Sequence, residues 1–260
     1  MRSPLHSPFP LNTAGAEDSP FITPDGRTLY FFFTPDPGVP PERQLLDRVT
    51  GVYATSERNG AWTTPERVVL QDPGTLALDG CVFVQGAVMW FCSAREGYTG
   101  VNLFTAEYHE GAWRTWRYTG DTLNREYQVG ELHITADGKE MSFYSPRNGG
   151  KGGLDIWVSR YENGAWKSPE NVEAVNTPSN EGWPFLNQDG DELWFTRTDE
   201  GSPAIFRSTN VEGAWQEPML IISSFAAEPS LDEKGNLYFA HHYIRDGKLI
   251  EADIFLARKK

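Results

Sequence analysis

The chain has 260 residues, of which 39% are apolar and 13% aromatic, and its formal net charge is −13. This composition is typical of a globular protein with a large core, and an acidic surface repels nucleic-acid backbones and anionic membranes, so both are excluded as expected partners. No apolar run approaches the ~18 residues of a membrane-spanning helix, and the opening stretch MRSPLHSPFPLNT has no signal-peptide core.

These features and the cysteines bear on the cellular compartment of the protein. The sequence as given predicts a cytoplasmic protein, with a periplasmic or secreted protein as the alternative if a signal peptide has been removed. Cys81 and Cys92 have no metal-type spacing and fall on adjacent strands of one predicted hairpin. They are either two buried thiols or a cross-strand disulfide, and a disulfide would indicate an exported protein.

The tripeptide Gly-Ala-Trp occurs four times, at intervals of about 50 residues. The four tryptophans of these GAW turns are Trp62, Trp113, Trp166 and Trp215. A fixed period of this size indicates repeated supersecondary units.

Each unit begins with two β-rich segments joined by a tight turn, and this predicted hairpin occurs five times. The five hairpins start at Ser19, Asp79, Glu131, Trp183 and Glu228. Turns such as Asp137-Gly138 are strong hairpin signals, because both turn positions favour positive φ. A third strand follows, and a fourth begins at the GAW tryptophan. Each unit is therefore predicted to be a four-stranded meander, with strands A to D.

The fifth unit runs to Lys260 without a GAW turn or a fourth strand. The segment PLNTAGAEDSPF, from Pro10, matches AVNTPSNEGWPF, from Ala174, which follows a strand D. Residues 5–9 are therefore predicted to supply the missing strand, which would close the ring and remove exposed sheet edges. The predicted fold is all-β, a five-bladed β-propeller of four-stranded antiparallel blades whose N-terminal strand completes the last blade.

The single predicted domain, 1–260, divides into five blades. Their approximate limits are 17–70, 78–120, 129–173, 181–222 and 227–260, the last together with strand 5–9.

Three stretches carry a family resemblance. The copies SPFITPDGRTLYF and EGWPFLNQDGDELWF, and the run GGLDIWVSRYENGAWKSPENV, resemble the WD40-like repeats of TolB-type propellers. The resemblance extends over nearly the whole chain and implies the propeller fold. It implies less about activity, because one fold hosts many functions. The broad group includes protein-interaction modules of the bacterial envelope.

Acidic residues gather where strand A of each unit begins. In a propeller, the starts of strands A and the ends of strands B share one face around the central channel. The acids are Glu17, Asp18, Asp79, Glu131, Glu181 and Glu228, and the ends of strands B add Arg95, Arg147, Arg197, His241 and His242. Alternation along the strand places His133 on the same side as Glu131. This mouth of the channel is the predicted pocket.

These residues also have a structural interpretation. The TolB resemblance implies that an acid just before the strand-A proline binds backbone N–H groups of a neighbouring blade, which would apply to Glu17 and Glu181. The arginines can pair with the acids. Trp183 can stack on a sugar or pack in the core.

The first predicted function is a non-catalytic ligand-binding propeller, whose acidic channel mouth takes a sugar, a cation or a basic partner. We expect a monomer with a small molecule or sugar at the central channel. The predicted ligand-binding residues are Asp79, Glu228, Arg95, Arg147, Arg197 and Trp183.

The alternative function is a glycan-type hydrolase. Propellers of the arabinanase and fructosidase kind place three carboxylates at the starts of inner strands, and the arrangement here is similar. The similarity implies Asp18 as general base, Glu131 as the group that tunes the acid's pKa, and Glu181 as general acid. Glu131 departs from those families, in which the tuning group is an aspartate, and Asp79 of the second unit is the alternative for this role. A metal-assisted variant would use Glu131 and His133 as ligands of a divalent ion.

Overall fold

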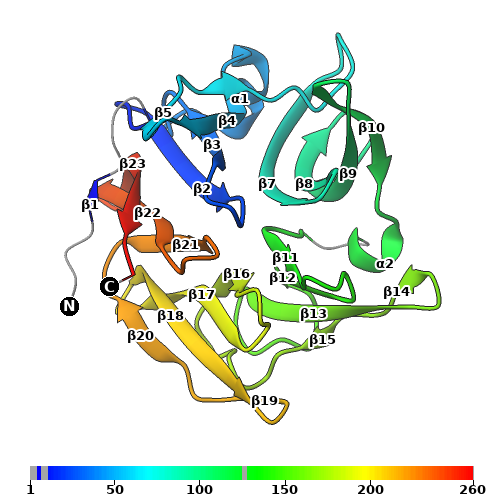
Figure 1. Ribbon diagram of the computed structural model, residues 1–260, viewed down its shortest axis with the longest axis vertical. Helices are drawn as coiled ribbons and strands as arrows, with labels where there is room; N and C mark the ends of the chain where they lie inside the picture. The colour runs from blue at the N-terminus through cyan, green and yellow to red at the C-terminus, as the bar shows by residue number, and fades with distance from the viewer. Residues whose placement is uncertain (1–4, 7–10, 125–127, 260) are drawn as a thin grey trace.

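The computed structural model describes residues 5–6, 11–124 and 128–259. In this part of the chain the strands form five successive antiparallel meanders around a common centre (Figure 1). None of the helices described is long and apolar enough to cross a membrane.

The elements follow one another in chain order, meander by meander. Meander 1 contains β2 (Ala16–Ile22), β3 (Thr28–Thr34), α1 (Pro41–Asp47), β4 (Gly51–Arg58), β5 (Ala61–Trp62) and β6 (Glu66–Arg67). Meander 2 contains β7 (Ala77–Gln85), β8 (Val88–Arg95), β9 (Asn102–His109) and β10 (Ala112–Tyr118), and α2 (Asp121–Asn124) follows it. Meander 3 contains β11 (Leu132–Ile134), β12 (Glu140–Ser145), β13 (Asp155–Glu162), β14 (Ala165–Trp166) and β15 (Glu170–Asn171).

The last two meanders complete the circle. Meander 4 contains β16 (Glu181–Leu186), β17 (Glu192–Asp199), β18 (Ser202–Val211), β19 (Ala214–Trp215) and β20 (Met219–Ile222). Meander 5 contains β21 (Ala226–Leu231), β22 (Leu237–Arg245) and β23 (Lys248–Ala257). All five predicted hairpins are confirmed, because the first two strands of each meander pair antiparallel. That each meander is one blade, with the predicted limits, stays a prediction.

The beginning of the chain joins the fifth meander. Strand β1 (Leu5–His6) pairs antiparallel with β23, with Leu5 opposite Leu256 and His6 opposite Phe255. The predicted closing strand is therefore confirmed for residues 5–6, whereas 7–9 lie outside the described residues. Strand β2 also meets β23, at the parallel pair Ala16 and Ala252, so one sheet contains both the first and the last described strands (Figure 1).

The GAW tryptophans fill the spaces between neighbouring meanders. Trp62 packs against a cluster that includes Tyr238 and Leu256 of meander 5, and Trp166 meets Trp90 of meander 2 edge to face at 5.9 Å. Trp113 packs against the cluster that contains Tyr30 of meander 1, and Trp215 packs on the core between meanders 3 and 4. Each tryptophan thus faces the meander before its own, and burial of these large rings explains why the turn recurs.

Two layers of side chains line the central channel. Most innermost strands carry a β-bulge, which re-aims the residue in the bulge. The first layer consists of the bulge residues Ser19, Trp183 and Glu228, all with positive φ, together with Glu131 directly before β11. The corresponding bulge residue of β7, Cys81, packs against the core instead. Two residues further along each strand, the second layer consists of Phe21, Phe83, His133, Phe185 and Ser230.

Of the two alternatives for the cysteines, buried thiols or a disulfide, the structure shows the disulfide. Cys81 and Cys92 form a disulfide across β7 and β8, with their Cα atoms 5.3 Å apart.

Candidate functional site

Three carboxyl groups from meanders 1, 3 and 5 meet at the channel. Ser19 joins two of them, because its backbone N–H donates to Oε2 of Glu228 and its Oγ donates to Oε1 of Glu131 at 2.7 Å. Asp18 lies near enough to affect the titration of both. Asp18, Glu131 and Glu228 are called the acid cluster below. A hollow of about 30 Å³ beside Glu131 and Glu228 is also lined by Trp183.

The acid cluster has unusual protonation. Burial, followed by repulsion from Glu131 and Glu17, raises the pKa of the Asp18 carboxyl from 3.8 to about 8. Burial, with repulsion from Asp18 and Glu131, holds the pKa of Glu228 well above its ordinary value. Burial also raises the pKa of Glu131, but hydrogen bonds from Ser19, Tyr144 and Trp183 oppose the rise. The hydrogen bond from Ser19 to Oε1 favours the carboxylate form of Glu131.

Such a cluster can supply both partners of general acid–base chemistry. Near neutral pH, a carboxyl with a pKa of about 8 retains its proton and can donate it. A neighbouring carboxylate such as Glu131, which accepts a hydrogen bond from Ser19, can receive a proton. Different environments that separate the pKa values of adjacent acids are a recurring feature of active sites.

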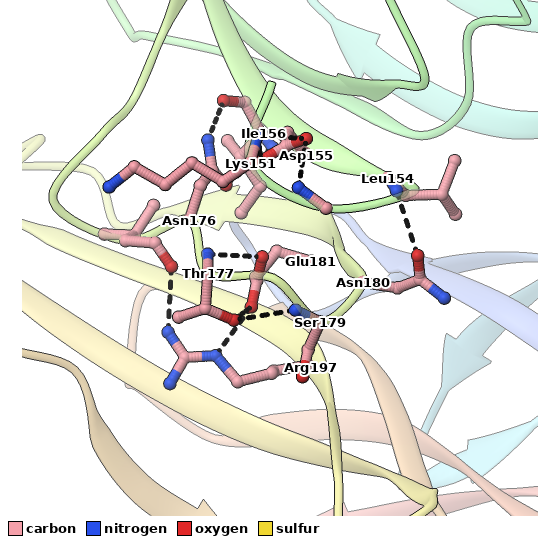
Figure 2. A network of polar contacts seen from close by, with 12 residues as sticks. Lys151, Leu154, Asp155, Ile156, Asn176, Thr177, Ser179, Asn180, Glu181 and Arg197 are labelled. Atoms are coloured by element: carbon pink, nitrogen blue, oxygen red, sulfur yellow. Dashed lines mark hydrogen bonds and ion pairs between the residues drawn. The ribbon is translucent and has the colours of Figure 1, made fainter. Parts of the chain in front are cut away.

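Glu181 does not join the acid cluster. Its fully buried carboxylate accepts hydrogen bonds from the N–H of Thr177 at 2.9 Å and from Nε of Arg197 at 2.9 Å (Figure 2). Glu17 is held in the same way by Thr13. The structural interpretation thus fits both residues, and we replace Glu181 by Glu228 in the candidate catalytic set.

The predicted ligand-binding arginines are also engaged within the fold. Arg95, Arg147 and Arg197 donate to the backbone carbonyls of Leu70, Leu123 and Val175, in the connections between meanders. Each guanidinium also lies over an aromatic ring of its own meander.

Asp79, also predicted to bind a ligand, is buried and pairs with Arg95 at 2.9 Å while accepting a hydrogen bond from Ser93. These groups fasten neighbouring meanders together, so the ligand-binding role predicted for Asp79 and the arginines is not supported by their contacts.

Trp183 stays in the candidate site, and the structure adds Tyr144, which the sequence reasoning missed. The rings of Trp183 and Tyr144 lie 4.9 Å apart, and both side chains lie near enough to Glu131 to affect its pKa. A Cβ on Gly130 would come within 1.8 Å of the Tyr144 ring, and one on Gly182 within 3.1 Å. The glycines at these two strand-A starts are the sequence signal for a large side chain packed over them.

His133 lies in an aromatic layer. Its ring centroid is 4.8 Å from that of Phe83 and 4.4 Å from that of Phe185. Burial lowers the pKa of the imidazole from 6.5 to about 3, and Nδ1 is buried without a hydrogen-bond partner. No group of three or more His, Cys, Asp or Glu side chains in the described ranges is arranged to hold a metal ion. Within these ranges, the predicted metal-binding pair of Glu131 and His133 therefore has no third ligand, and the metal-assisted variant is not supported.

Replacing His133 by phenylalanine is expected to stabilise the protein by about 1–3 kcal/mol, because an unsatisfied buried nitrogen is removed. The gain should grow as the pH falls from about 6.5 towards 3. In that range the unfolded chain binds a proton that the folded His133 does not, so the wild type loses stability. Urea unfolding at pH 7 and pH 4.5 measures the difference, with the exposed His109→Asn as control. An equal effect at both pH values would contradict the buried, neutral His133.

The comparison with known proteins identifies the class of fold. No protein-family model matches the chain, and no curated protein sequence matches it. Among solved structures, it is similar to an endo-arabinase from Bacteroides thetaiotaomicron, with a TM-score of 0.63 and 13% identity over 98% of each chain. A xylan β-1,4-xylosidase from Bacillus halodurans has a TM-score of 0.60 and 16% identity over 98% of this chain and 54% of its own.

A putative TolB from Agrobacterium tumefaciens gives a TM-score of 0.53 and 12% identity over 95% of this chain and 92% of its own. At such identities the likeness shows the fold alone, and the chain is a β-propeller. Membership of the TolB-type repeat family stays a prediction, since glycosidases and a TolB both share the fold.

Proposed function

We propose that the protein is a glycan-acting hydrolase whose acid–base chemistry resides in the acid cluster. The observation that carries the proposal is the meeting of three carboxyls from three meanders, one of them with a pKa of about 8. The glycosidases that share the fold support a sugar substrate. The proposal adopts the alternative function predicted from the sequence, with a revised set of residues.

The pKa shifts suggest a role for each acid. Asp18 donates its proton to the glycosidic oxygen as the bond to the anomeric carbon breaks. Glu131 takes a proton from the water that attacks that carbon. Glu228 keeps the pKa of Asp18 high through repulsion. Asp18 is then the general acid and Glu131 the general base. The similarity to arabinanase-type propellers implied instead that Asp18 is the base and that Glu131 tunes the pKa of the acid.

Space restricts how a substrate can approach. The hollow beside Glu131 and Glu228, about 30 Å³, has room for water but is too small for a sugar ring. The sugar would therefore bind above the cluster at the channel mouth, where the faces of Trp183 and Tyr144 are suited to stacking.

The test is hydrolysis of arabinan, xylan and their 4-nitrophenyl glycosides by the wild type and by variants. Asp18→Asn and Glu131→Gln are each expected to lower kcat by about 10²–10⁴-fold. Glu200→Gln, at an exposed glutamate, serves as control and should keep full activity.

A second function, sugar binding without hydrolysis, is favoured by the aromatic pair of Trp183 and Tyr144. A melting-temperature rise with arabinan or xylan fragments that is lost in Trp183→Ala, without any turnover, would establish binding and reject hydrolysis. Full activity in Asp18→Asn and Glu131→Gln would exclude the acid cluster as the catalytic site.

A further inference from the structure

A much larger cavity lies away from the acid cluster. Its volume is about 1030 Å³, and it extends from the hairpin turns of the inner strands into the space between meanders 4 and 5. Its walls are mostly apolar, with Phe185, Trp194 and Ile222 from meander 4 and Leu237, Phe239 and Phe255 from meander 5. The His133 layer borders both this cavity and the small hollow at the acids.

The position of the cavity follows from the repeat. Each GAW tryptophan packs towards the preceding meander, but no GAW turn accompanies meander 5, and the chain has no tryptophan before Trp62. Among the described residues, no ring therefore takes the place in the space between meanders 4 and 5 that a GAW tryptophan takes at the other interfaces. Trp194 shows the difference, because its counterpart Trp90 meets Trp166 at 5.9 Å, whereas Trp194 lines the cavity.

Several charged side chains line this space, among them Arg207, Glu192 and Lys259, and Arg207 is the one that lies against Trp194. Arg207 pairs with Trp194 across the strands, and the residues at the same position elsewhere are Ala54, Thr105, Val158 and Leu256. Its guanidinium lies 5.5 Å from the centre of the Trp194 ring, and Nη1 donates to Glu192 at 2.9 Å. Its Nε is buried without a hydrogen-bond partner. A donor beside an aromatic face, in a site of this size, is typical of a small-molecule pocket.

We propose that this cavity binds an aromatic small molecule that carries a hydrogen-bond acceptor. Its ring takes the place of the missing tryptophan against Trp194, and its acceptor pairs with the guanidinium of Arg207, whose side chain lines the cavity. Stacking on Trp194 and burial of the ring supply the affinity. The site is independent of the proposed hydrolase, because none of its polar groups belongs to the acid cluster.

The probe is 1-anilinonaphthalene-8-sulfonate, an aromatic compound with an acceptor group whose fluorescence rises in apolar sites. We expect saturable binding of one equivalent, and Arg207→Gln should weaken it about tenfold. Ala257 lines the cavity from β23, so the ring of Ala257→Phe should occupy part of it and weaken binding while the protein keeps its stability. Ala257→Ser, which fills nothing, should bind like the wild type.

Ala106 provides a matched control for filling. It pairs with Met89 as Ala257 pairs with Leu237, but it is fully buried beside Trp113. Ala106→Phe is therefore expected to destabilise the fold, as overpacking does. The proposal is overturned if Ala257→Phe is as damaging as Ala106→Phe, or if Arg207→Gln and a folded Ala257→Phe both bind the probe like the wild type. Glycoside hydrolysis by these variants is a separate readout, so the two proposals can fail independently.

Discussion

Asp18→Asn is expected to stabilise the protein, with a gain that grows as the pH rises from about 4 to about 8. The pKa of Asp18 is 3.8 ordinarily and about 8 in the fold. Between these values the folded state holds a proton that the unfolded chain has released, so the stability of the wild type falls as the pH rises. One pKa unit corresponds to about 1.4 kcal/mol, and the full effect amounts to several kcal/mol. Asparagine resembles the protonated acid and removes this loss.

Urea unfolding of wild type and Asp18→Asn at pH 5 and pH 8.5 measures the effect. Glu131→Gln and Glu228→Gln should change stability in the same direction, because each removes a charge that repels the others. Glu200→Gln should leave the pH dependence unaltered. If Asp18→Asn were less stable than the wild type at both pH values, the cluster would be a structural network and its proposed catalytic role would lose its main support. A stabilising substitution that abolishes activity is typical of functional sites.

Glu181→Ala is expected to lower the free energy of unfolding by about 3–5 kcal/mol. The substitution leaves the Arg197 guanidinium beside a buried cavity and removes the acceptor of the Thr177 N–H. Breaking a buried pair by deleting one partner usually costs this much, because the remaining charge is uncompensated. Chemical denaturation at pH 7 gives the value.

Glu17→Ala is the matched control. Glu17 makes the corresponding hydrogen bonds to Thr13, but the described contacts give it no arginine partner. Its loss should be smaller, about 1–3 kcal/mol. Equal losses for Glu17→Ala and Glu181→Ala would show that Arg197 adds nothing to the network in Figure 2.

The sequence was sufficient for the hairpins and for the candidate acids, but not for their partners. Turn residues and the GAW period depend on local conformation, which a sequence reports directly. The register between strands is harder to predict from the sequence. Strand pairing shows that Glu181 matches Glu17, whereas Asp18 matches Gly182. A shift of one residue turns the side chain to the other face of a strand, so Asp18 reaches the acid cluster and Glu181 does not.

The remaining differences arise from contacts between distant parts of the chain. Alternation alone ignores the bulges that aim Ser19, Trp183 and Glu228 into the channel. Tyr144 reaches Glu131 only because two glycines leave room for its ring. The large cavity lies where the fifth repeat has no GAW tryptophan. The sequence shows that this tryptophan is absent, but the consequence can be inferred only once the packing of the other four is known.

The pairing of β1 with β23 has a consequence for how the chain folds. Leu5 and Leu256 are neighbours in one sheet although nearly the whole chain separates them. During synthesis the first strand leaves the ribosome long before its partner exists, so it has to wait without its native neighbour. Contacts of such sequence separation raise the contact order and slow folding, since a long loop must close before they form. The pairing of β1 with β23 can therefore form only after β23 has been synthesised.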